Sequence, residues 1–183
     1  MATHDILFVQ GAGEGAHPWD QPMVDNLRAA LPDKSIAYPK IDGLETVDWP
    51  STKSAITEAL AGLKDGGIVV AHSLGGAAML KFLSEGNTKP SLAGLFLIAV
   101  PYKAADGDLA GDDFGFPADF ARSLPAIDPI VFYHSRDDDF VDFANLARYR
   151  EKVTGARFLA VDGHQHQFLE PFPELAEDVR SVG

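Results

Sequence analysis

The chain contains 183 residues, a length that predicts one globular domain spanning residues 1–183. An apolar fraction of 46% excludes a disordered chain, and the absence of cysteine excludes disulfides, thiol nucleophiles and cysteine metal sites. A formal net charge of −12 argues against nucleic acid as a partner, because the phosphate backbone is also negative. The beginning of the chain lacks the basic region of a signal peptide, and its longest apolar stretch is too short to span a membrane. We therefore expect a soluble cytoplasmic protein with no membrane partner.

Short apolar runs alternate with segments of helical pattern along the chain. Strands are expected at Ile6–Val9, Ser35–Tyr38, Ile68–Ala71, Leu95–Val100, Ile130–Tyr133 and Arg157–Val161. Helices are expected between them, at Asp20–Ala30, Ser51–Leu63, Leu74–Ser84, Phe143–Val153 and Pro173–Val179. Continuous hydrophobicity is typical of strands buried on both faces, and their alternation with helices implies right-handed crossovers. The pattern predicts an α/β fold of three layers (α/β/α) around a six-stranded, mostly parallel sheet.

The segment Pro101–Pro129 does not follow this alternation. It is rich in Asp, Gly, Pro and Phe, and at most a short helix near Ala118–Ser123 is expected within it. Long irregular segments in compact domains are often functional, although a variable surface excursion explains this one equally well. Tyr102 and the aromatic residues that follow are candidates for the wall of a substrate pocket, with plain core packing as the alternative.

Residues 71–76, Ala-His-Ser-Leu-Gly-Gly, connect a buried strand to a helix through a tight turn. A serine at such a turn is held at a strained backbone angle with its hydroxyl exposed, and its neighbours two positions away must be small. Ala71 and Gly75 meet that requirement around Ser73. The Leu74 amide, at the start of the helix, can stabilise an oxyanion. The alternative role of Ser73 is that of a simple helix cap.

A nucleophilic serine needs a base, and the base needs an acid that orients it. Three aspartates at 137–139 and two histidines, His164 and His166, follow later strands of the predicted sheet. Loops at the carboxyl ends of parallel strands share one edge of the sheet, where open α/β folds place their sites. The residues by themselves leave both choices open. The histidine pair could also hold a metal with the aspartates, although no recognised zinc spacing is present.

The first strand leads into a loop rich in glycine, from Gly11 to Gly15. The loop matches neither of the two glycine-rich nucleotide fingerprints, because the required spacings are absent. A better use is to supply a second oxyanion amide, from Ala12 or alternatively from Gly13. His17 and Trp19, which follow, are expected to line the substrate pocket.

These features together resemble the α/β-hydrolase superfamily, and most closely the small lidless serine hydrolases related to YdeN and retinoblastoma-binding protein 9. The resemblance is carried by the turn at Ser73, by Ser135–Val141 and by Gly163–Phe168. The family acid is followed three places later by an apolar residue, as Asp138 is by Val141. The family histidine commonly precedes Gln-Phe, as His166 does here.

The resemblance implies a triad of Ser73, Asp138 and His166, and a strand order of 2-1-3-4-5-6 without a cap domain. It implies a carboxylesterase of small or medium esters that needs no cofactor or metal. Gly13, His17, Trp19, Tyr102 and Phe140 are the residues expected to bind substrate. The alternatives are a protein-binding or scaffolding role with incidental turnover, and a cofactor-free lyase or perhydrolase using the same residues.

Overall fold

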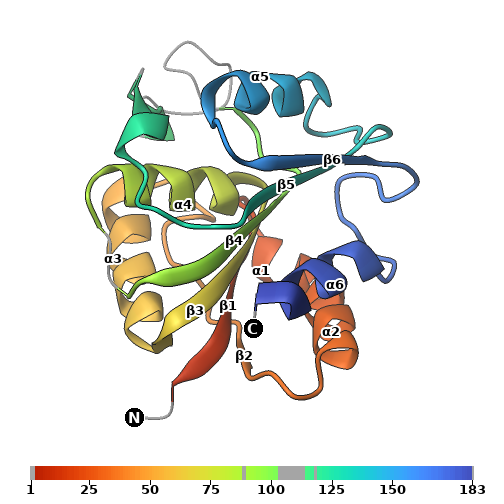
Figure 1. Cartoon of the computed structure of the whole chain (residues 1–183), viewed down its shortest axis with the longest axis horizontal. Coiled ribbons are helices and arrows are strands. Elements are labelled where there is room, and N and C mark those ends of the chain that lie inside the picture. Colours follow the sequence, from red (N-terminus) through yellow and green to blue (C-terminus); the bar gives the residue numbers. More distant parts are fainter. Residues whose placement is uncertain (1–2, 88–89, 103–113, 118, 183) are drawn as a thin grey trace.

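The computed structural model describes residues 3–87, 90–102, 114–117 and 119–182. Its centre is a six-stranded sheet with the order β2-β1-β3-β4-β5-β6, in which all neighbouring strands run parallel (Figure 1). The strands are β1 (His4–Val9), β2 (Ile36–Ala37), β3 (Leu63–His72), β4 (Leu92–Ile98), β5 (Ile130–Ser135) and β6 (Arg157–Val161). The predicted fold and strand order are confirmed.

Helices cover both faces of this sheet, as the unbroken apolar strands predict. Alternate strand residues face opposite sides, so that Leu7 packs in one core and Phe8 in the other. The first face is covered by α3 (Trp49–Ala61), α4 (Ser73–Ser84) and α5 (Ala144–Lys152), and the second by α2 (Gln21–Ala30) and α6 (Pro173–Val182). A single helical turn, α1 (Ala16–Trp19), precedes α2 and was not expected from the sequence.

Several element boundaries differ from those expected, most of all the start of β3. Leu63 belongs to β3 and not to the preceding helix, because the helix ends at Ala61 and Gly62 leads directly into the strand. In the irregular segment, the expected short helix is a 3₁₀ turn over Phe120–Ser123. Residues 103–113 and 118 of that segment lie outside the described residues, so most of its predicted role stays a prediction.

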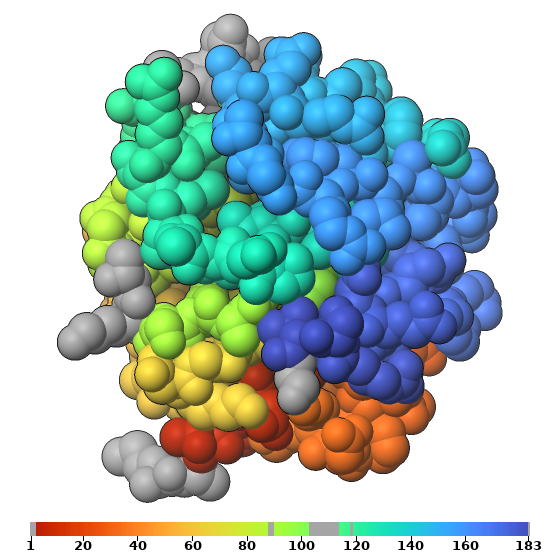
Figure 2. Space-filling model, viewed as in Figure 1, coloured from red at the N-terminus to blue at the C-terminus, as the bar shows by residue number. Residues whose placement is uncertain are grey.

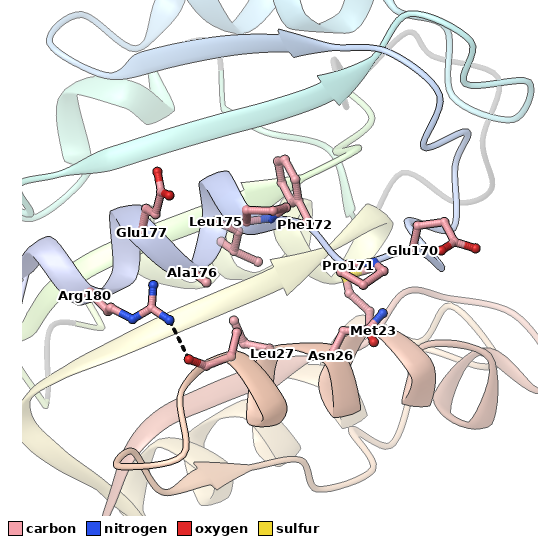
Figure 3. Close-up of a pocket in the computed structure, with 12 residues that line it drawn as sticks. Met23, Asn26, Leu27, Glu170, Pro171, Phe172, Leu175, Ala176, Glu177 and Arg180 are labelled. Carbon is pink, nitrogen blue, oxygen red and sulfur yellow. Dashed lines mark hydrogen bonds between the residues drawn. The ribbon is translucent and has the colours of Figure 1, made fainter.

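The last helix, α6, lies against α2, and the two form one side of the molecule (Figure 2). Between them runs a groove of about 160 Å³, lined by apolar side chains such as Met23 and Leu175, with Arg180 at one end (Figure 3). Arg180 Nη2 donates a hydrogen bond of 2.6 Å to the Ala30 carbonyl. Within the described part of the chain, no helix has the length and apolar character needed to cross a bilayer.

The carboxyl ends of β1, β3, β5 and β6 meet at one edge of the sheet. Val9 pairs with Ala71, and Ser135 pairs with Val161, so the loops after these four strands begin at similar heights. Parallel pairing therefore brings the glycine-rich loop, the Ser73 turn, the aspartate cluster and the late histidines to the same place.

Candidate active site

Ser73 lies at the junction of β3 and α4 with a φ of 50°. This left-handed conformation is strained for a residue other than glycine, and it lifts the side chain above the sheet edge. The backbones around it are in close contact, because a Cβ on Gly75 would lie 1.9 Å from the Gln10 carbonyl oxygen. Glycine at position 75 is what allows α4 to start so close to the loop after β1.

A chain of hydrogen bonds runs from Ser73 through His166 to Asp138. Ser73 Oγ lies 3.1 Å from His166 Nε2, and His166 Nδ1 lies 2.9 Å from Asp138 Oδ2. A carboxylate only accepts hydrogen bonds, so Nδ1 carries the ring proton and leaves Nε2 free to accept one from the serine hydroxyl. The side chains come from three separate loops, and both Ser73 and His166 are buried.

Asp138 is held by more groups than His166 alone. Its Oδ1 accepts hydrogen bonds from the amides of Phe140 (2.9 Å) and Val141 (2.8 Å). Its Oδ2 also lies 3.2 Å from His134 Nε2, which donates to the Val141 carbonyl at 2.9 Å. Burial by itself would raise the pKa of Asp138, but the hydrogen bonds from His134, His166 and Val141 outweigh it and hold the pKa well below its usual range. The carboxyl is therefore ionised and fixed in position.

His134 had no assigned role in the sequence, although a polar residue at the end of a buried strand was a signal that it needs a partner. The other aspartates of the cluster do not reach His166. Asp137 Oδ1 accepts from Ser135 Oγ and from the amides of Gly163 (3.1 Å) and Gln165 (3.3 Å), so it joins the loops after β5 and β6. The hydrogen bond from Ser135 is the main reason that the pKa of Asp137 is lowered.

An open cavity of about 150 Å³ lies directly above Ser73. The described residues that line it come from the loop after β1, the α1–α2 junction and the loops of the triad: Gly11, Ala12, Ala16, Trp19, Asp20, His72, Ser73, Phe140, His166 and Gln167. Trp19 and Phe140 are large apolar side chains that are nevertheless 60% and 72% exposed. The Phe140 ring centroid lies 5.0 Å from that of His166, so this aromatic ring flanks the entrance to the site.

Backbone amides of the glycine-rich loop have different partners. The Gly11 amide donates to Asp20 Oδ2 at 2.8 Å, and the Gly13 amide donates to the Leu44 carbonyl at 3.2 Å. Within the described residues, the Ala12 amide has no such partner. Leu74 stands in the first turn of α4, where backbone amides lack an acceptor within the helix. Ala12, rather than Gly13, is therefore available as an oxyanion donor.

Three residues expected to bind substrate are not among the described residues that line this cavity. The His17 ring stacks on Tyr38, with centroids 4.2 Å apart and planes 9° apart. Tyr102 packs edge-on against the buried Tyr149 at 5.1 Å, in a cluster of core aromatics. Gly13 is occupied by its bond to Leu44. The sequence shows that His17 and Tyr102 are aromatic and that Gly13 lies in the glycine-rich loop. It does not reveal the packing or hydrogen-bond partner of each residue.

His164 and His166 also separate in the structure. The His164 ring stacks on Phe168 at 4.9 Å, whereas His166 faces Ser73. Among the residues the structure describes, no three His, Asp or Glu side chains gather in a group that could hold a metal ion. His72 lies in the cavity wall, and its Nδ1 lies 3.0 Å from Asp20 Oδ2. That contact was not expected from the sequence.

Comparisons with known proteins give a family and a fold for this chain. The family model of serine hydrolases matches residues 9–170. The ydeN gene product of B. subtilis is 16% identical with a TM-score of 0.72, and 98% of each chain is covered. The 2-hydroxy-6-oxo-6-phenylhexa-2,4-dienoate hydrolase of Rhodococcus sp. strain RHA1 is 12% identical with a TM-score of 0.76, covering 98% of this chain and 90% of that chain. An esterase from Rhodococcus sp. ECU1013 is 15% identical with a TM-score of 0.64, over 98% and 90% of the two chains.

No curated protein matches the chain. These three structural likenesses are at low sequence identity and indicate the fold alone. The family model, in contrast, covers most of the sequence, including the Ser73 turn, the aspartate cluster and both late histidines. The chain therefore belongs to the serine hydrolase family.

Proposed function

We propose that the protein is a carboxylesterase that cleaves small or medium esters through a covalent acyl-enzyme on Ser73. The observation that carries the proposal is the hydrogen-bonded chain from Ser73 through His166 to Asp138 beneath an open cavity. A serine, a histidine and an aspartate in this order supply a nucleophile, a general base and a group that orients the base.

In the first half of the reaction, His166 Nε2 takes the hydroxyl proton as Ser73 Oγ attacks the ester carbonyl. Asp138 stays ionised, fixes the tautomer of His166 and stabilises the imidazolium that forms. The protonated Nε2 then gives its proton to the departing alcohol oxygen, and the acyl group remains on Ser73. Water, deprotonated by the same nitrogen, attacks the acyl carbon, and His166 returns the proton to Ser73 Oγ as the bond between Oγ and the acyl group breaks and the acid is released.

Negative charge develops on the carbonyl oxygen in each tetrahedral intermediate. The amides of Leu74 and Ala12 are the donors that we assign to this oxygen, one from the start of α4 and one from the loop after β1. Donors that are fixed before the reaction need no reorganisation in the transition state, which is why such a pair contributes strongly to the rate.

The cavity supports a small acyl group. Its volume of about 150 Å³ is similar to that of a cavity that accommodates benzene, so we expect acyl chains of up to about six carbons to fit within it. Trp19 and Phe140, which are exposed at the rim, offer flat apolar surfaces for the alcohol portion of the substrate. The esterase from Rhodococcus sp. ECU1013 shares the fold, which is compatible with this activity.

Labelling with a fluorophosphonate probe tests the nucleophile directly. We expect wild-type protein to be labelled at Ser73 and to hydrolyse p-nitrophenyl acetate, and S73A to do neither while keeping its circular dichroism spectrum. A folded wild-type protein that is neither labelled nor active on any ester would refute the proposal and favour a binding role.

A panel of p-nitrophenyl esters tests the substrate class. We expect kcat/KM to be highest for acyl chains from two to about six carbons and to fall for dodecanoate, because the longer chain exceeds the cavity. Matched p-nitrophenyl amides in the same panel measure whether the preference extends beyond esters. Equal rates for acetate and dodecanoate would contradict the assignment of the cavity as the acyl site.

A further inference from the structure

A second acid–histidine pair is buried beside the triad. His72 is the last residue of β3, and Asp20 is the junction residue between α1 and α2. His72 Nδ1 lies 3.0 Å from Asp20 Oδ2, and each side chain is only 2% exposed. Neither residue is used by the mechanism above. Burial of two ionisable groups costs folding free energy. The groups that this pair contacts therefore point to its function.

The partners of the His72 ring determine its protonation. Nδ1 faces the Asp20 carboxylate, while Nε2 lies 2.9 Å from the carbonyl oxygen of His166. Both groups accept hydrogen bonds, and a neutral imidazole has only one N–H to donate. An imidazolium satisfies both contacts. Although burial opposes the charged form, the Asp20 carboxylate outweighs it and raises the pKa of His72, with further contributions from the His166 carbonyl and the more distant Asp138.

Asp20 also holds the loop after β1. Its Oδ2 accepts the Gly11 amide at 2.8 Å, and Gly11 directly precedes Ala12. The loop and the pair are in close contact, because a Cβ on Gly11 would lie 3.3 Å from both His72 Nδ1 and Ser73 Cβ. One carboxylate oxygen therefore connects the end of the strand that precedes Ser73 to the loop that carries the proposed oxyanion amide.

We propose that Asp20 and His72 form a buried ion pair that sets the distance between the Ala12 amide and the His166 imidazole. The pair is connected to the Ala12 amide through the neighbouring Gly11, whose amide donates to Asp20. It is connected to the His166 imidazole through the His166 carbonyl, which accepts from His72. Asp20 and His72 are positioning residues, since Ser73 carries out the attack on the ester and His166 carries out the proton transfers. The functional part of this proposal rests on the proposed function, but the ion pair and its loop contacts do not.

The charge of Asp20 has a second consequence. The rings of His72 and His166 have centroids only 4.9 Å apart, and His166 becomes positive in the transition state. Two neighbouring imidazolium ions repel each other, and the Asp20 carboxylate compensates for the charge of His72. Without that carboxylate, burial favours the neutral form of His72, which has a single N–H to donate, so its contact with the His166 carbonyl is no longer secured.

Two measurements test the pair without any turnover. Nitrogen-15 NMR of wild-type protein at pH 7 should show both ring nitrogens of His72 protonated, with H72Q used to assign the signals. Hydrogen exchange should show the peptide that contains Gly11 protected in wild type and exchanging about tenfold faster or more in D20N. A singly protonated His72 in wild type would overturn the ion pair, and unchanged exchange in D20N would overturn the loop contact.

Kinetics then tests the link to catalysis. We expect D20N to lower kcat for p-nitrophenyl acetate by about 10- to 100-fold with KM nearly unchanged, because the donors shift relative to the base. D25N is the matched control, since Asp25 is an exposed residue of α2 that bonds to Gln21 and Arg28. It should retain wild-type kcat and exchange.

Variants of His72 separate positioning from folding. H72Q keeps a donor where Nε2 stands and should lose less kcat than H72F, which removes both hydrogen bonds. Wild-type kcat in folded D20N and H72F would overturn the positioning role. If the wild-type protein hydrolyses no ester, the proposed function fails, and the NMR and exchange results still decide whether the ion pair and its loop contact exist.

Discussion

Replacement of Gly75 by alanine places one methyl group against the loop that supplies the proposed oxyanion amide. The new Cβ would lie 1.9 Å from the Gln10 carbonyl oxygen and 3.0 Å from the Gln10 carbonyl carbon. Real Cβ atoms essentially never come closer than 3.0 Å to another heavy atom, so the two backbones must separate by about 1.1 Å, the difference between 3.0 and 1.9 Å. A backbone carbonyl cannot turn aside as the end of a flexible side chain can.

That separation is expected to act on catalysis because each backbone carries one of the two proposed oxyanion donors, the amides of Ala12 and Leu74. Gln10 is two residues before Ala12, and Gly75 directly follows Leu74. A misplacement of about 1 Å at an active site costs on the order of 10²-fold in rate, and overpacking costs about 1–3 kcal/mol of stability. We therefore expect G75A to remain folded with a lower melting temperature and to lose about 100-fold in kcat, with a smaller change in KM.

The assay is hydrolysis of p-nitrophenyl acetate, read beside thermal unfolding by circular dichroism. G76A is the matched control, because its Cβ would lie 2.4 Å from Val100 Cγ2, a side chain that follows β4. It should destabilise the protein comparably and keep most of its kcat. Wild-type kcat in folded G75A, or an equal loss of kcat in both variants, would refute the assignment of the Gln10–Ala12 loop to the oxyanion.

The remaining predictions concern the triad. S73A should lower kcat by roughly 10³-fold or more and shift the melting temperature little, because alanine adopts the same backbone angle without new contacts; residual activity near wild type would contradict it. D138N should lose on the order of 10³-fold in kcat, whereas D139N, at an exposed position, should lose little; the reverse ranking would move the acid to Asp139. Because the folded pKa of Asp138 is depressed, its stabilising contribution is present above about pH 3.9, the pKa of an unfolded aspartate, and is lost as the pH falls through the lower folded value. Urea unfolding should therefore show wild type more stable than D138N at pH 6, with the difference shrinking toward pH 2; a constant difference would contradict the shift.

The sequence predicted the order of the elements and the loops that meet at the site. Strands with unbroken apolar runs are buried on both faces, and parallel strands expose their carboxyl ends at one edge, so the Ser73 turn and the late aspartates and histidines had to meet. The resemblance to a known family then indicated Asp138 and His166 within their clusters. The structure places these two side chains within hydrogen-bond distance of each other, and their roles remain predictions that the variants above test.

Several features could not be read from the sequence because they depend on contacts between distant segments. His17 and Tyr102 are residue types that commonly line substrate pockets, yet each of these rings packs on another aromatic ring. His134 gains its role only because the loop after β5 folds back to place Asp138 and the Val141 carbonyl at its ring. In each case local pattern defines the type of side chain, and the partner is chosen by the tertiary fold.

By itself, the sequence determined the α/β architecture, the tight turn at Ser73 and the small residues that the turn requires, since these follow from local hydrophobicity and sterics. Only the tertiary structure decided which backbone amides are free, that His134 supports Asp138, and that Asp20 lies against His72. The physical reason is that hydrogen bonds depend on positions within a few tenths of an ångström, and residues 52 positions apart along the chain reach such positions only when the whole sheet is assembled.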